Sequence, residues 1–212
     1  MKVTIVYDNT VFAEGLKADW GFSCLVEAHG KTILFDAGAN GIILFSNIQR
    51  LNIDPDSVDT IFLSHAHFDH TGGLSTFLNA NSKVTVYAPI TYRGIKKARE
   101  VEYYEDPQEI CDGIYTTGML QDIEQSLVVK TEKGLVVVVG CSHPGVATIL
   151  ESAKQFGDPY AIIGGLHDFR DFEILNDLSY VCPTHCTRYL TKIERLFPDK
   201  YIEGGAGKVI EI

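Results

Sequence analysis

Apolar and polar positions follow two different periods along the chain, and these periods predict a mixture of strands and helices. Short apolar runs bounded by turn residues are typical of strands. They occur at residues 3–7, 22–28, 32–35, 60–63, 84–88, 127–130, 135–139, 161–163, 180–182 and 209–212. Apolar residues at helical spacing predict helices at residues 42–51, 72–78, 146–156, 172–178 and 188–197. Charges dominate residues 93–112, where no element is assigned.

The order of elements is similar in the two halves of the chain. Each half begins with a hairpin, turned at residues 29–30 in the first and 132–134 in the second, and continues with helix, strand, helix and strand. Helices cover sheets because an apolar sheet face has to be buried. The order therefore predicts an α/β (α+β) protein, one domain spanning residues 1–212, with two layers of sheet that are each covered by helices. Residues 135–139 are apolar throughout, which predicts a central strand buried on both faces.

Length, charge and cysteine content narrow the class of protein. The 212 residues, 45% of them hydrophobic, suit one globular domain. The net charge of −10 argues against general nucleic-acid binding, although a bound cation could still attract an anionic substrate. Asp8 interrupts the first apolar run before a signal peptide could form, and no apolar run is long enough to cross a membrane. Five cysteines form no secreted disulfide framework, so a cytoplasmic protein is expected, with Cys182 and Cys186 packed as small apolar side chains.

Four potential metal ligands fall within six residues after the strand predicted at 60–63. Residues 65–70 read His-Ala-His-Phe-Asp-His and precede two glycines, so they are expected to form a loop at a strand end. Alternate residues of an extended segment point the same way, which lets His65 and His67 bind one metal ion while Asp69 and His70 face a second. A polar surface loop with incidental metal affinity is the alternative, and the position at a strand end argues against it.

Three further histidines also follow predicted strands. His143, His167 and His185 come after residues 135–139, 161–163 and 180–182, so they are expected along the same edge of the sheets as residues 65–70. For His167, a structural role fits about as well as a role at the site. His29 lies in a hairpin turn and is expected to be exposed and without function.

These motifs, together with Phe-Asp-Ala-Gly at residues 35–38, resemble the metallo-β-lactamase superfamily. The resemblance spans nearly the whole chain. Three further motifs are similar to a branch of metal-dependent hydrolases that includes synthases of a dihydropterin-linked ribofuranosylaminobenzene phosphate. These motifs are GCSHPG at residues 140–145, GGLH at 164–167 and PTHC at 183–186. The resemblance implies a four-layer αββα sandwich with the site at one edge of the sheets.

The same resemblance implies roles for single residues. It makes His65 and His67 ligands of a first metal ion, and it places Asp36 behind the site as a support. The ligands that it implies for a second ion are Asp69, His70 and His185.

Two positions depart from the common pattern of the superfamily. Residues 121–125 lack the histidine usual before the second hairpin, and Cys141 stands at the position of a bridging aspartate. His143 is predicted to supply the missing third ligand of the first ion. It lies between a strand and a helix N-terminus, where the positive end of the helix disfavours the imidazolium. Asp122, Cys141 and His167 are the alternatives.

The chemistry expected of such a site is hydrolysis of an ester, phosphoester or lactone. Two divalent ions ~4 Å apart, zinc before iron or manganese, activate a shared water. Asp69 would accept or orient its proton, and His167 would protonate the leaving group or donate to an oxyanion. The alternatives are a transferase that joins a pterin to a ribofuranosylaminobenzene phosphate, an iron-dependent oxidoreductase and a non-catalytic binding module. His67 stands where the pattern of the flavodiiron relatives has a glutamate, and this difference favours zinc.

A basic segment bears on the substrate. Arg93, Lys96, Lys97 and Arg99 place four positive charges within seven residues of an acidic chain. A solvated helix face is one interpretation. The functional one assigns Arg93, Lys96 and Lys97 to binding an anionic small-molecule substrate, with tyrosines nearby that could stack on a planar ring.

Overall fold

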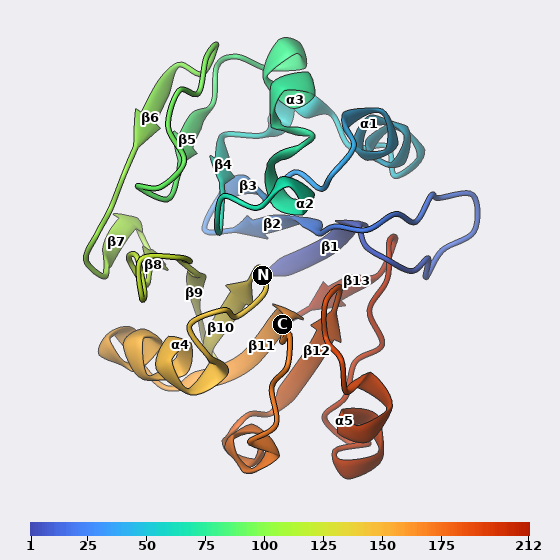
Figure 1. The fold of residues 1–212 in the computed structure, drawn as a ribbon, viewed down its shortest axis with the longest axis vertical. Coiled ribbons are helices and arrows are strands. Elements are labelled where there is room, and N and C mark those ends of the chain that lie inside the picture. Colours follow the sequence, from blue (N-terminus) through green and yellow to red (C-terminus); the bar gives the residue numbers. More distant parts are fainter.

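Two sheets packed face to face, with helices on both outer sides, make up the computed structural model, which describes residues 1–212 (Figure 1). The first sheet has the strand order β13-β1-β2-β3-β4-β5-β6. Its strands are β1 (Lys2–Tyr7), β2 (Ser23–Ala28), β3 (Lys31–Phe35), β4 (Thr60–Phe62), β5 (Thr85–Tyr87), β6 (Glu100–Glu102) and β13 (Val209–Glu211). The second sheet has the order β12-β11-β10-β9-β8-β7. Its strands are β7 (Gln108–Cys111), β8 (Ile114–Thr116), β9 (Leu127–Thr131), β10 (Gly134–Val139), β11 (Pro159–Gly165) and β12 (Tyr180–Thr184).

Helices cover the outer face of each sheet (Figure 1). Helices α1 (Gly41–Arg50), α2 (Phe68–Thr71) and α3 (Leu74–Ala80) accompany the first sheet, with a 3-10 turn η1 (Pro55–Ser57). Helices α4 (Val146–Ala153) and α5 (Leu190–Leu196) accompany the second, with 3-10 turns η2 (Lys154–Phe156) and η3 (Phe172–Asp177). The four-layer αββα prediction is therefore confirmed. No helix has the length and apolar character needed to cross a bilayer.

Three clusters of buried apolar side chains fill the spaces between the four layers. The central cluster combines residues of both sheets, among them Ile5, Phe35, Val138 and Ile163, all at most 1% exposed. A second cluster lies between the first sheet and its helices, and a third lies between the second sheet and its helices. Strand β10, predicted to be central, lies between β9 and β11 with its valines fully buried.

Parallel pairing brings the carboxyl ends of the strands that precede the candidate ligands to one edge of the sheets. Strands β3, β4 and β5 are parallel neighbours in the first sheet, as are β10, β11 and β12 in the second. The carboxyl ends of parallel strands meet at the same edge, and sites in α/β sheets form there. The bridge between His65 and Glu124 connects the two sheets at this edge.

Several elements differ from those predicted. Strands β6, β7 and β8 occupy a region in or next to residues 93–112, where no element was assigned. The edge strands β6 and β7 contain no fully buried residue, so they lack a regular apolar period, and β8 has only three residues. Helix α2 begins within the loop predicted at residues 65–70. Residues 172–178 form 3-10 turns instead of an α-helix.

Candidate metal centre

The six residues proposed as metal ligands come from three chain segments at the common edge of the sheets. One pair of residues, His65 and His67, lies in the extended chain after β4, and Asp69 and His70 lie on the first turn of α2. His143 and His185 follow β10 and β12. The structure therefore brings together residues that are up to 120 positions apart in the chain.

The first group of ligand atoms belongs to His65, His67 and His143. One nitrogen of each ring lies within 4.8 Å of the other two. Nε2 of His65 is 3.0 Å from Nδ1 of His67, and both rings lie 4.9 Å from the His143 ring, measured between centroids. Three imidazoles at this separation can bind a single metal ion.

The second group belongs to Asp69, His70 and His185, whose ligand atoms also lie within 4.8 Å of one another. Oδ2 of Asp69 is 3.2 Å from Nε2 of His185 and 3.8 Å from Nε2 of His70. The rings of His65 and His70 are 4.1 Å apart, so the two groups are adjacent. Two histidines and a carboxylate are a ligand set suited to zinc, iron or manganese.

A buried carboxylate supports both groups from behind. Asp36 is fully buried, and its carboxylate accepts hydrogen bonds from the backbone N–H and the hydroxyl of Ser64, each at 2.7 Å. Its Oδ2 is also 2.7 Å from Nδ1 of His70, and Ser64 Oγ is 2.8 Å from Nδ1 of His65. Asp36 thus sets the orientation of one ring in each group, which leaves the opposite ring nitrogens facing the site.

His185 has a comparable support from the end of β1. Asp8 accepts a hydrogen bond from the His185 backbone N–H at 2.9 Å, and Oδ1 of Asn9 is 3.0 Å from Nδ1 of His185. The sequence did not predict a role at the site for Asp8 or for Asn9. Asp8 directly follows an apolar strand, which is the signal that also marks the histidines.

Glu124 is a support that the sequence did not reveal. It is fully buried, and its carboxylate accepts four backbone hydrogen bonds at 2.9 to 3.1 Å from residues 140–143. The loop that carries His143 is therefore bound to a single side chain. Burial raises the pKa of Glu124, while the N–H donors of His143, Ser142 and Cys141 oppose that rise.

Electrostatics keep several of the histidines neutral. Burial, followed by the neighbouring histidines, lowers the pKa of His65, and the same causes lower the pKa of His143 to about 4. Burial also lowers the pKa of His185. Burial alone would lower the pKa of His70 as well, but Asp36 outweighs it and raises that pKa. Neutral imidazole is the form that binds metal ions.

Backbone strain is concentrated at the same edge. The left-handed region, rare for residues other than glycine, holds Asp36 (φ 53°), Ser142 (61°), His167 (42°) and His185 (49°). Such strain is typical of functional sites. Gly140 is required for a different reason, because a Cβ atom there would lie 2.2 Å from Oγ of Ser64.

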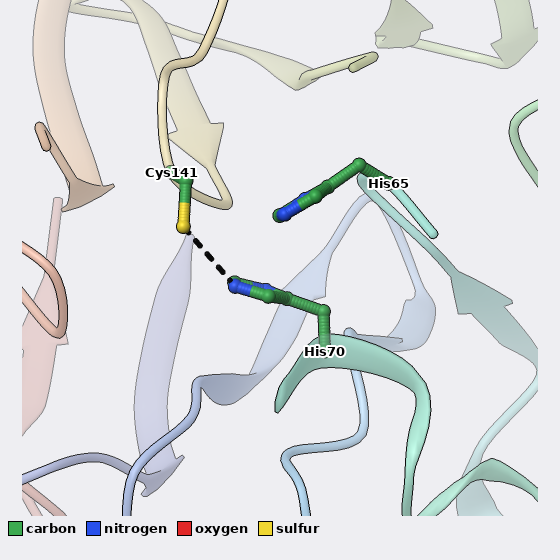
Figure 2. Close-up of side chains that lie close together, drawn as sticks. All are labelled: His65, His70 and Cys141. Atoms are coloured by element: carbon green, nitrogen blue, oxygen red, sulfur yellow. Dashed lines mark hydrogen bonds between the residues drawn. The ribbon is translucent and has the colours of Figure 1, made fainter. Parts of the chain in front are cut away.

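Two cysteines border the site. Sγ of Cys141 lies 3.2 Å from Nε2 of His70, and Figure 2 shows it pointing with His65 and His70 into one space. Cys186 is only half-buried, and its sulfur lies within 4.8 Å of the Cys141 sulfur. The expectation that Cys186 packs as a buried apolar residue is therefore wrong, whereas Cys182 is 1% exposed within the central core.

The remaining predicted residues lie around the site. The His167 ring is 5.1 Å from that of His143, and both line a hollow of about 240 Å³. Lys96 and Lys97 line a cavity of about 480 Å³ together with Phe68, which belongs to the segment of metal ligands. The Arg93 guanidinium stacks on the Tyr103 ring, 3.8 Å from its centroid. His29 is exposed in its hairpin, as predicted.

The residues present fit a metal centre. Nε2 of His143 and Nε2 of His185 are buried and make no hydrogen bond in the structure. Burying a polar atom without a partner is costly unless another group satisfies it. A divalent cation would satisfy both nitrogens, since each belongs to one of the two groups of ligand atoms.

Comparison with known proteins agrees with this geometry. The model of the metallo-beta-lactamase superfamily matches residues 21–186, so the chain belongs to this superfamily. Members of the superfamily are mostly metal-dependent hydrolases, usually with zinc, and the prediction of an enzyme of this kind is confirmed.

Particular relatives cover the whole chain. It is 27% identical over 281 residues to 7,8-dihydropterin-6-methyl-4-(beta-D-ribofuranosyl)-aminobenzene-5'-phosphate synthase of Methanocaldococcus jannaschii, covering 98% of this chain and 95% of the relative. An uncharacterised protein of the same archaeon is 30% identical over 260 residues, covering 99% and 100%. The crystal structure of Tm1679, a metal-dependent hydrolase of the beta-lactamase superfamily, has a TM-score of 0.84 at 24% identity, covering 100% of this chain and 99% of that one.

Proposed function

We propose that the protein is a dinuclear metal-dependent hydrolase that acts on an ester, phosphoester or lactone of a small molecule. The observation that carries the proposal is the pair of adjacent ligand groups, His65/His67/His143 and Asp69/His70/His185. Each offers three protein ligands, the number that catalytic zinc sites use while keeping a position open.

The chain's own residues divide the work. Two bound divalent ions supply activation of water and positive charge for the oxygens of the scissile bond. Asp69 orients the attacking water or accepts its proton from the side of the second group. Burial opposes ionisation of Asp69, but His185 and His70 outweigh it and lower the pKa of its carboxyl, so it is charged at neutral pH. His167, half-exposed beside His143, is placed to protonate the leaving group.

The cavity beside the site favours an anionic substrate. Its wall combines apolar side chains, among them Leu74 and Ile95, with the ammonium groups of Lys96 and Lys97. A phosphate or carboxylate near the lysines would place an apolar body against the rest of the wall. Arg93 does not line this cavity, and its guanidinium stacks on the Tyr103 ring instead.

Metal analysis of purified protein tests the proposal. We expect two zinc ions per wild-type chain and no visible absorption, whereas a coloured iron protein would favour the oxidoreductase alternative. The His143→Ala variant should retain its fold and hold close to one ion, because the first group would keep only two ligands. His29→Ala, in an exposed hairpin distant in the fold from both groups, is the matched control and should keep two ions. If His143→Ala also keeps two tightly bound ions, His143 acts on substrate and another residue completes the first group.

A transferase that joins a pterin to a ribofuranosylaminobenzene phosphate is the second candidate. The observation that favours it is the similarity to the archaeal synthase along 98% of this chain. Metal-loaded protein should be tested against phosphodiesters, lactones and pterin phosphates in parallel. Release of a hydrolysis product from the first two classes supports the hydrolase. Joining of the pterin of a pterin phosphate to an added ribofuranosylaminobenzene phosphate, with release of the phosphate that the pterin carried, supports the transferase.

A further inference from the structure

The segment between β1 and β2 (blue loop in Figure 1) brings an aromatic side chain to the second ligand group. Trp20, the single tryptophan of the chain, donates a hydrogen bond from Nε1 to Oδ2 of Asp69 at 2.8 Å. Its ring lies 5.0 Å from the His185 ring, measured between centroids. Trp20 therefore contacts two of the three residues in the group Asp69/His70/His185.

Trp20 is the only residue outside the ligand group that donates a hydrogen bond to the Asp69 side chain. The neighbouring histidine nitrogens of His70 and His185 lie at 3.8 and 3.2 Å and belong to the same ligand group. An isolated carboxylate can turn about its side-chain bonds, whereas one oxygen held by an N–H donor keeps a single orientation. Trp20 supplies that donor from a segment 49 residues away.

The segment that carries Trp20 is itself anchored to the site. The Trp20 backbone N–H donates to Oδ1 of Asp19, and the Tyr7 hydroxyl donates to Oδ2 of the same carboxylate at 2.8 Å. The next residue, Gly21, donates to Oδ1 of Asn9, which also contacts His185. The backbone on both sides of the indole is thus anchored, on one side through Asp19 to Tyr7 and on the other to Asn9, which supports His185.

Burial does not explain why a tryptophan stands here. The side chain is 58% exposed and belongs to none of the three apolar clusters. Exposed tryptophan contributes little to folding stability, whereas a donor beside a metal-binding carboxylate can change metal affinity strongly. We propose that Trp20 is a positioning residue that holds the Asp69 carboxylate in the second metal group.

This inference rests on the proposed dinuclear site, and its test uses Trp20→Phe in the full-length protein. Phenylalanine keeps an aromatic ring and removes only the N–H donor. We expect the ion at the second group to bind about 10- to 100-fold more weakly in a competition titration with a chromogenic chelator, and the first ion to bind as in wild type. Phe12→Leu is the matched control, because Phe12 is an exposed aromatic residue of the same segment and contacts Lys208 instead of the site.

Two further readouts separate positioning from a structural role. In wild type, the fluorescence of the single tryptophan should change with the second equivalent of metal and not with the first. In an Asp69→Asn background, Trp20→Phe should change metal affinity less than 3-fold, because its effect acts through the carboxylate. Urea unfolding of the metal-free variants should match that of wild-type protein.

The outcomes are distinct. If wild-type protein binds two ions and Trp20→Phe binds both with unchanged affinity, the Trp20 inference is wrong and the dinuclear site stands. Equal weakening of both ions together with lower stability would assign Trp20 a structural role and also overturn the inference. Fewer than two ions in wild-type protein would overturn the proposed dinuclear site and the Trp20 inference with it.

Discussion

The carboxylate of Glu124 offers the sharpest test of how the site is supported. It is fully buried and accepts backbone hydrogen bonds from Gly140, Cys141 and Ser142 at Oε1 and from His143 at Oε2. Glu124→Gln keeps the shape of the side chain but replaces one acceptor oxygen by an NH₂ group. With the amide oxygen facing the three N–H groups, the NH₂ group would face the N–H of His143.

The expected loss of stability in Glu124→Gln follows from these contacts. Loss of the acceptor for the His143 N–H costs about 1–3 kcal/mol, because a buried donor stays unpaired. The other three hydrogen bonds lose their charged acceptor, which costs about 1 kcal/mol each. Relief of the buried charge, which raises the pKa of Glu124, offsets part of this loss. We therefore expect a net loss of about 2–4 kcal/mol in the free energy of unfolding.

The measurement is urea or thermal unfolding of the metal-free protein. For a chain of this length, a loss of that size lowers the melting temperature by about 4–16 °C. Because the stability of a domain is about 5–15 kcal/mol, the variant should still fold, and its weakened 140–143 loop should bind the first ion less tightly. Glu132→Gln, an exposed position in the β9–β10 hairpin, is the control and should shift the melting temperature by less than 2 °C. A Glu124→Gln variant as stable as this control would refute the reasoning.

Three further predictions follow from the site. Asp69→Asn preserves the shape of the side chain but removes its charge, so turnover of the best substrate should fall by about 100-fold or more. The stability of the metal-free variant should stay within about 1 kcal/mol of wild type, and retained turnover would exclude Asp69 from the reaction. Removal of metal by a chelator should lower the melting temperature, and zinc should restore it, since ligands that bind only the folded state stabilise it; an unchanged melting temperature would argue against tight metal binding. Gly140→Ala should destabilise the fold by about 1–3 kcal/mol, because its Cβ would collide with Oγ of Ser64, and a stability equal to wild type would contradict the close approach described above.

The apolar periods of the sequence determined most of the fold and the position of the site. Strands and helices depend on local alternation of buried and exposed positions, which a sequence records directly. Residues 135–139 predicted the central strand β10 because every position there is apolar. The position of the histidines directly after strands predicted that they lie close together, since parallel strands end at one edge of a sheet.

Tertiary structure alone decided what supports the ligands. Glu124 binds a loop 16 to 19 residues away, Trp20 bonds to Asp69 across 49 residues, and Asp8 reaches His185 across 177. Such contacts leave no period in the sequence, because the partners of Glu124 and Asp8 include backbone N–H groups, which every residue except proline carries. The edge strand β7 was not predicted either. Its residues are exposed or only partly buried, so its sequence shows no alternation of apolar and polar positions. Composition and spacing therefore located the candidate metal centre, and the packing of distant segments decided which side chains support its proposed ligands.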